Sequence, residues 1–197
     1  MLLVKFIWVS FFYWLMPDLP AQTFQTTIVE GSTFTLKGSS NINKFELVYT
    51  GNLAKTNKVQ VEREPTRMNM KSGSGVSLKV EDFKSTNAYI TKDFRKMLRA
   101  DTYPNLVIEP VSVWKLKNLA GTVCVLINLT IAGCTHQETI SLNLTQQDAT
   151  ALQCKGIHKI SLKKYALAAP KKALGAVQVN DEVAIDMLLK LQFKKIK

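Results

Sequence analysis

Apolar and polar positions alternate through much of the chain, most clearly between Gly121 and Leu144. In the first half of this segment, the residues at alternate positions are on balance more polar than their neighbours. The apolar positions between them are Val123, Val125, Ile127, Leu129 and Ile131. Successive side chains of an extended chain point to opposite sides, so this pattern predicts a strand with one apolar face. We expect a turn at CTHQ and a second strand from ETISLNL. A hairpin alone cannot bury its apolar face, so further strands must close over it.

Similar alternation predicts strands elsewhere along the chain. Two short strands are expected between Gly31 and Thr50, one at 58–64, one from Val76 to Val80, one around Leu106, one over 152–162 and one over 183–193. The last strand has six apolar residues in strict alternation and would be about 40 Å long at ~3.3 Å per residue. Pro110 predicts a strand break or an edge position, since proline cannot donate to a ladder.

One segment has helical spacing instead. Its apolar residues are Ile90, Phe94, Met97 and Leu98. Thr91 can cap a helix over 91–100, Asp93 would lie in the first turn, and Pro104 stops the helix. About eight antiparallel strands, several of them long and one-sided, with one short helix favour an all-β closed barrel, which has no exposed edges.

The first 21 residues have the pattern of an export signal. Lys5 is followed by an uncharged apolar run, Pro17 and Asp18 end that run, and Ala21 offers a small residue for cleavage. The run is shorter than the ~20 apolar residues of a membrane-spanning helix. We therefore predict a signal peptide over 1–21, a single mature domain over 22–197, and a periplasmic or secreted protein.

The formal net charge is +11, and the composition, 46% hydrophobic and 21% charged, is ordinary for a globular domain. The lysines are scattered over expected outer faces and loops, and no nucleic-acid-binding motif is present. A solvated surface is the simpler interpretation, and nucleic acid is not an expected partner. Transient contact with an anionic membrane surface stays open, as does the oligomeric state, a dimer included.

Neither the cysteines nor the histidines indicate a reactive site. Strand phase puts Cys124 outside and Cys154 inside, which argues against a bridge between them, whereas Cys134 with either partner stays open. The two histidines have no zinc-like spacing from the cysteines. There is no Ser-His-acid arrangement, no phosphate-binding glycine loop and no pair of carboxylates with acid–base spacing. We expect a protein that is not an enzyme and has no metal and no cofactor.

Three segments carry motifs of a known family. The first is a strand, a short helix and a Tyr-Pro leading into the next strand, with matching positions at Asp93, Leu98, Tyr103, Pro104, Leu106 and Ile108. The second is the hairpin, with Leu129, Thr130, Ile131, Gly133 and Thr135. The third is the C-terminal part, with Tyr165, Pro170, Gly175, Asp181 and Val183. Together, over roughly 76–193, they resemble the YceI-like proteins. The resemblance implies a lipocalin-like antiparallel barrel, exported, with a polyisoprenoid such as a quinone tail, or a related amphiphile, in its lumen.

An eight-stranded barrel is near the size at which side chains either fill the interior or leave room for one small ligand. The pattern alone does not decide between a lipid carrier and a filled barrel acting as an interaction module with a basic exterior. The resemblance favours a cavity that holds an isoprenoid or other long-chain lipid, for transport, storage or sensing. The helix and the Pro170–Gly175 loop would be its gates. The expected ligand-binding residues are Leu78, Val80, Leu98, Leu106, Ile108, Leu129, Ile131, Ile160, Leu162, Met187, Leu189 and Leu191.

Overall fold

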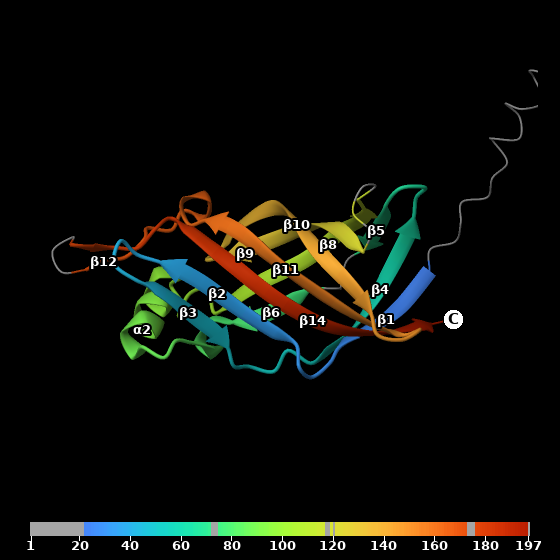
Figure 1. Ribbon diagram of the computed structural model, residues 1–197, viewed down its shortest axis with the longest axis horizontal. Coiled ribbons are helices and arrows are strands. Elements are labelled where there is room, and N and C mark those ends of the chain that lie inside the picture. The colour runs from blue at the N-terminus through green and yellow to red at the C-terminus, as the bar shows by residue number, and fades with distance from the viewer. Residues whose placement is uncertain (1–21, 72–74, 117–118, 120, 173–175, 197) are drawn as a thin grey trace, which may run out of the picture.

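The structure is a computed structural model that describes residues 22–71, 75–116, 119, 121–172 and 176–196 (Figure 1). The predicted signal peptide lies outside the described residues. The strands are β1 (Gln22–Ile28), β2 (Thr33–Ser39), β3 (Lys44–Tyr49), β4 (Lys55–Arg63), β5 (Met68–Lys71), β6 (Val76–Lys79), β7 (Phe83–Lys84), β8 (Asn105–Lys115), β9 (Thr122–Ile131), β10 (Cys134–Gln146), β11 (Ala151–Ser161), β12 (Lys171–Lys172), β13 (Val177–Gln178) and β14 (Glu182–Ile196). The helices are the 3₁₀ turns η1 (Val80–Asp82) and η2 (Lys163–Tyr165) and the α-helix α2 (Ala88–Met97).

Eight strands form a closed antiparallel barrel, as the alternation predicted. Backbone pairing runs in the order β1-β4-β5-β8-β9-β10-β11-β14, and pairing of β14 with β1 closes the ring. The long final strand was also predicted correctly. It reaches 15 residues, which is about 50 Å at ~3.3 Å per residue. It forms one continuous edge along which two shorter strands lie end to end.

Those two strands are β1 and β2. β1 pairs with the C-terminal part of β14, from Leu191 to Ile196, and β2 pairs with its N-terminal part, from Ala184 to Leu188. β3 and β4 continue beside them, because β3 pairs with β2 and β4 pairs with β1. In the same way β5 and β6 both lie along β8. Three of the eight barrel positions are therefore occupied by interrupted strands.

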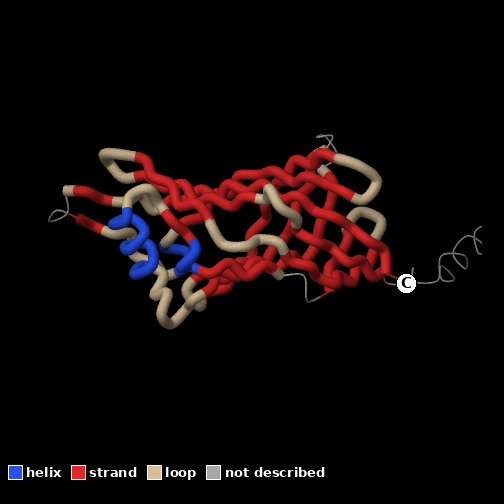
Figure 2. Tube along the Cα trace, turned by 90° about the horizontal axis from the view of Figure 1, so that it is seen from below, coloured by secondary structure: helices blue, strands red, loops and turns tan. Residues whose placement is uncertain are grey.

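The barrel is closed differently at its two ends. At the end of β1 and β4, all neighbours are joined by backbone hydrogen bonds. At the other end no pairing joins β3 to β6 within the described residues. On the side of β3 that faces away from β2, the short β7 pairs with β3 through Tyr49–Phe83 and Val48–Lys84. Figure 2 shows α2 at this second end, which we call the helix end. A helix therefore completes the wall that strands complete elsewhere.

The helix begins earlier than expected. Asn87 is the N-cap, and its side chain accepts a hydrogen bond from the Tyr89 backbone N–H at 2.9 Å. Thr91, predicted as the cap, instead accepts from the Ser85 N–H at 2.9 Å and ties the helix to the preceding strand. Asp93 accordingly lies in the second turn and not the first. The prediction was wrong because asparagine four residues upstream is an equally good cap.

Three predictions about the strands also need correction. The hairpin turn lies at Ala132 and Gly133, both with positive φ (47° and 82°), and CTHQ already belongs to β10. Positive φ at two adjacent residues suits a two-residue hairpin turn that matches the strand twist. Pro110 does not end β8; the register shifts between Pro110 and Ser112, and this irregularity accommodates the missing donor. Val80, expected in a strand, begins η1.

Candidate functional site

The helix end of the barrel contains a cavity of about 380 Å³. Inward-facing residues of six strands and one face of α2 line it, and almost all of them are apolar. The deep lining comes from Phe34, Leu36, Phe45, Leu47, Leu106, Ile108, Leu129, Ile131, Ile160, Leu162, Val183 and Ile185, and from Ile90, Phe94, Met97 and Leu98 of α2. The volume falls in the ~300–1,000 Å³ range of small-molecule sites, near its lower limit.

An aromatic cluster holds α2 against the sheet at the base of this cavity. Phe94 of the helix packs on Phe83 of β7, with ring centroids 5.5 Å apart. Phe83 also contacts Tyr49 at 5.1 Å and Phe34 at 6.2 Å, both edge-on. Such pairs add about 0.5–1.5 kcal/mol each beyond area burial. These contacts position the apolar face of the helix toward the lumen.

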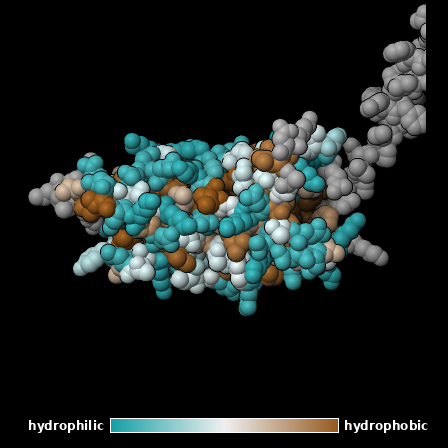
Figure 3. Space-filling model, in the orientation of Figure 1, coloured by the Kyte–Doolittle hydropathy of each residue, from teal (hydrophilic) through white to brown (hydrophobic). Residues whose placement is uncertain are grey.

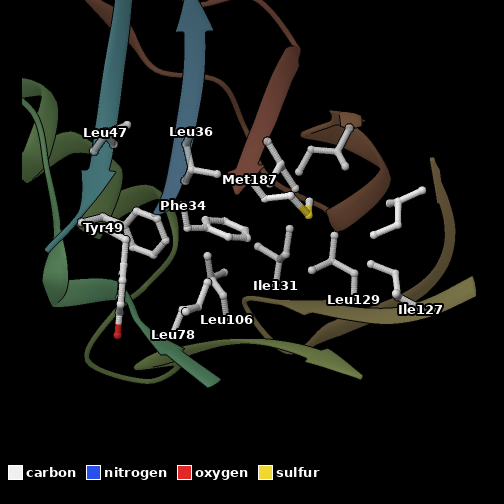
Figure 4. Packing of buried hydrophobic residues seen from close by; sticks show 14 of the residues in the cluster. Phe34, Leu36, Leu47, Tyr49, Leu78, Leu106, Ile127, Leu129, Ile131 and Met187 are labelled. Atoms are coloured by element: carbon white, nitrogen blue, oxygen red, sulfur yellow. The ribbon is translucent and has the colours of Figure 1, made fainter. Parts of the chain in front are cut away.

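The cavity occupies only part of the barrel. Along β2 it extends from Phe34 to Ser40, which is about 20 Å at ~3.3 Å per residue. Toward the other end the inner side chains of β9 and β14 are buried but do not line it, including Ile127 and Met187. Figure 4 shows Phe34, Leu106 and Ile131 pointing toward one another from three strands, with Met187 and Ile127 beyond them. The cavity therefore lies in the helix-end part of the barrel, and buried side chains such as those of Ile127 and Met187 lie outside it.

Seven of the twelve predicted ligand-binding residues line the cavity: Leu98, Leu106, Ile108, Leu129, Ile131, Ile160 and Leu162. The other five do not line it. Leu78, Val80 and Met187 are buried in the core, and Leu189 and Leu191 are partly buried against it. Alternation identifies the inner face of a strand, but it carries no information on position along the barrel axis. That the seven lining residues bind a ligand stays a prediction.

Polar residues of the lining gather at the mouth, and alternation missed them. They are Ser40, Asn43, Asn87 and Asp93. The Ser40 hydroxyl donates to Asn43 Oδ1 at 2.8 Å and accepts from the Asn43 N–H at 3.1 Å, which shapes the turn between β2 and β3. Asn87 caps α2. Three of these four groups therefore serve the turn and the helix cap. The loop predicted as a gate contributes Pro170, whereas 173–175 lie outside the described residues.

A second cluster, which we call the Glu138 cluster, bridges β10 and β11. Backbone pairing between these strands covers only 143–146 with 152–155 in the described residues. Beyond it, the Glu138 carboxylate contacts His158 Nε2 at 3.3 Å and accepts from Lys164 Nζ at 2.7 Å and from the Tyr165 hydroxyl at 2.9 Å. His136 meets the Tyr165 ring edge-on at 5.1 Å. Side chains thus join two strands that backbone pairing leaves apart.

The environment of this cluster perturbs two pKa values. Burial alone would raise the pKa of Glu138, but the hydrogen bonds from Lys164, Tyr165 and His158 lower it below its usual value. Burial, reinforced by the hydrogen bond to the carboxylate, raises the pKa of Tyr165 far above its usual value. The cluster is therefore an ionised carboxylate held by a neutral phenol and a lysine. None of its members lines the cavity.

The three cysteines are free thiols in this structure: Cys124 and Cys154 are buried and Cys134 is half-buried. Burial raises the pKa of the Cys154 thiol to about 11, so it is a poor nucleophile at neutral pH. Among the described residues, no three His, Cys, Asp or Glu side chains are arranged to hold a metal ion. Nor does any helix in that part of the chain have the length and apolar character needed to cross a membrane.

The family model of the YceI-like domain matches residues 30–191. The chain belongs to the YceI-like family. This match confirms the resemblance and spans the barrel from the β1–β2 connection to β14. No curated protein matches the chain.

Solved structures with the same fold are similar to this YceI-like chain over most of their length. BcnA of Burkholderia cenocepacia has a TM-score of 0.63 and 16% identity, over 81% of this chain and 95% of that one. A polyisoprenoid binding domain from Saccharophagus degradans has a TM-score of 0.56 and 12% identity, over 85% of this chain and 97% of that one. The YCEI protein of Campylobacter jejuni has a TM-score of 0.50 and 14% identity, over 75% of this chain and 86% of that one. At these identities the likeness establishes the fold.

Proposed function

We propose that this YceI-like protein binds the hydrocarbon tail of an isoprenoid, such as that of a quinone, or of a similar long-chain lipid, in the cavity at its helix end. The observation that carries the proposal is the apolar hollow of about 380 Å³ enclosed by sheet and helix. A polyisoprenoid-binding domain with the same fold supports the choice of ligand class. The sequence pattern of residues 1–21 supports export to the periplasm or beyond.

The cavity suits a hydrocarbon because binding requires no polar contact along its length. Each buried methylene contributes about 0.8 kcal/mol, so about ten buried carbons would supply roughly 8 kcal/mol, the scale of micromolar binding, before entropic costs. The polar residues at the mouth leave the head group of an amphiphile at the open end. No chemistry on the ligand is needed, so the proposed role is binding for transport, storage or sensing and not catalysis.

Mass spectrometry of the lipid that copurifies with the protein tests this function. The protein, purified from its native compartment, is extracted with organic solvent, and we expect an isoprenoid lipid in stoichiometric amount. Leu129→Lys should abolish retention, because Leu129 is buried and an ammonium group there would face an apolar lumen. Since this variant can also impair folding, Ile131→Trp serves as a second variant that fills the cavity with an apolar ring.

The matched control for Ile131→Trp is Ile157→Trp, because Ile157 is 59% exposed and does not line the cavity. Circular dichroism and thermal unfolding verify that each variant is folded. An empty extract from the unmodified protein, or full lipid content in a folded Ile131→Trp variant, would overturn the proposal. Such a result would favour the alternative of a non-catalytic interaction module.

A further inference from the structure

The mouth of the cavity carries exposed apolar side chains. Ile42, in the turn between β2 and β3, is 67% exposed, and Tyr89, in the first turn of α2, is 78% exposed. Both also line the cavity, so they lie on the sheet side and the helix side of one opening. Figure 1 places the β2–β3 turn, α2 and β12 at the same end of the barrel, and Figure 3 shows an apolar patch at that end beside β12. Large apolar side chains on the rim of an apolar opening mark an interaction surface.

Basic side chains surround these two residues. Tyr89, Lys92 and Lys96 are spaced i, i+3 and i+7 on α2 and are all exposed, so they share the outer face of the helix. The inner face, with Phe94 and Met97, lines the cavity; Tyr89 is exposed and also reaches the lining, whereas Lys92 and Lys96 do not. Lys44, at the start of β3 beside the turn, is also exposed.

The charge of this region is strongly positive. Between positions 85 and 99 there are four basic residues and one acidic residue, a net charge of +3, and the acidic one, Asp93, is half-buried and lines the cavity. An aromatic ring and an aliphatic side chain flanked by lysines is the composition that binds the interface of an anionic bilayer. A soluble protein partner would need a complementary acidic surface and gives no reason for the position around a lipid-sized opening.

We infer that the helix end is a membrane-docking surface: Ile42 and Tyr89 insert at the head-group level of an anionic bilayer, and Lys44, Lys92 and Lys96 contact its phosphates. The mouth of the cavity then faces the acyl region, where a lipid tail can pass without crossing water. Docking does not require that the cavity be occupied, so this inference and the proposed function can fail separately.

Flotation of the purified protein with vesicles tests the docking surface. The probes are neutral phosphatidylcholine vesicles and vesicles in which about one-third of the lipid is phosphatidylglycerol, where each interfacial lysine should contribute about fivefold to affinity. We expect binding to the anionic vesicles that weakens as salt is raised. Ile42→Ser combined with Tyr89→Ser should weaken binding at least about tenfold, because both apolar anchors are lost. Lys92→Glu combined with Lys96→Glu should weaken it by at least as much.

Matched controls lie elsewhere on the barrel. Ile157→Ser removes an aliphatic side chain of β11 that is 59% exposed, and Lys194→Glu with Lys195→Glu reverses two exposed charges at the far end of β14. These variants should bind like the unmodified protein. Absence of binding to anionic vesicles, or equal losses in the controls, would overturn the docking surface. A mouth variant that instead dissociates a dimer in light scattering would show that a second copy occupies the surface, and would overturn it too.

Lipid content separates the two proposals. Lys92 and Lys96 do not line the cavity, so the double Lys→Glu variant should lose vesicle binding while retaining copurified lipid. If the unmodified protein copurifies with no lipid but still binds anionic vesicles, the binding function alone is refuted.

Discussion

Replacing Glu138 with glutamine should lower the free energy of unfolding by about 1–2 kcal/mol at pH 7. The Glu138 side chain is only 10% exposed and is contacted by three donor groups, and hydrogen bonds to charged groups are worth about 1.5–3 kcal/mol each. Glutamine keeps one oxygen for the buried Tyr165 hydroxyl but loses the charge that holds Lys164. Because the Lys164 side chain is 41% exposed, solvent screens its charge, and its hydrogen bond to Glu138 contributes an energy at the low end of this range.

Glu138→Ala should lower the free energy of unfolding further, by about 3–5 kcal/mol, because it leaves buried donors without their acceptor. The Tyr165 side chain is fully buried, and its hydroxyl would have no compensating water. The order Glu138→Ala, then Glu138→Gln, then the unmodified protein, in increasing stability, follows from the contacts alone. It would identify the cluster as the element that joins β10 to β11 where backbone pairing stops.

The loss caused by Glu138→Gln should depend on pH. Since the pKa of Glu138 is lowered in the folded state, the folded protein binds this proton more weakly than the unfolded chain does. Its contribution is complete above the unfolded pKa of about 4.3 and disappears as pH falls through the folded pKa. The difference between the unmodified protein and the variant should therefore shrink between about pH 5 and 3. Asp148 and Asp181, whose pKa values are also lowered, are present in both proteins and cancel.

Urea unfolding followed by tryptophan fluorescence measures these differences. The control is Glu46→Gln, which removes an exposed carboxylate 3.9 Å from Lys37 and should change stability by less than about 0.5 kcal/mol. A Glu138→Gln loss no larger than that of the control would refute the account of the cluster. A difference that stays constant down to pH 3 would refute the lowered pKa.

Two further predictions concern Tyr165 and the β9–β10 turn. Because the pKa of Tyr165 is raised in the folded protein, the stabilisation by its neutral hydroxyl is complete below the unfolded pKa of about 10 and is lost as the pH rises above it. When the pH is raised from about 9 to 11, the free energy of unfolding from urea titrations should therefore fall less for Tyr165→Phe than for the unmodified protein. Gly133→Ala should destabilise more than Gly121→Ala in thermal unfolding. Both glycines have positive φ, but a Cβ at Gly133 would lie 2.5 Å from the Tyr103 ring, whereas at Gly121 the nearest atom is 3.5 Å away. Equal melting temperatures would contradict the steric argument.

Alternation predicted the barrel because a period of two is a local property that each strand displays in its own sequence. It therefore identified β9, β10 and β14, but missed β1, whose segment QTFQTTI has few apolar residues. Depth along the barrel is set by strand stagger, which no single strand encodes, and so alternation grouped Leu189 and Leu191, which do not line the cavity, with Leu129, which does. The Glu138 cluster did leave a signal: Glu138 has the same strand parity as Ile140 and Leu142 and so faces inward. A carboxylate in phase with core residues predicts buried partners.

The hollow at one end follows from how each end of the barrel is closed. Where β1 and β4 complete the ring, neighbouring strands are about 4.8 Å apart, and inner side chains such as Val59, Val125 and Ile127 are buried. At the helix end no backbone pairing joins β3 to β6 in the described residues, and α2 packs there through Phe94 on Phe83 of β7, which pairs with β3. A helix is about 10 Å wide, roughly twice the spacing of strands. The perimeter is therefore larger while the inner side chains are of the same size. The excess space cannot be filled from the sheet, and the helix that creates it also supplies one of its walls and part of its rim.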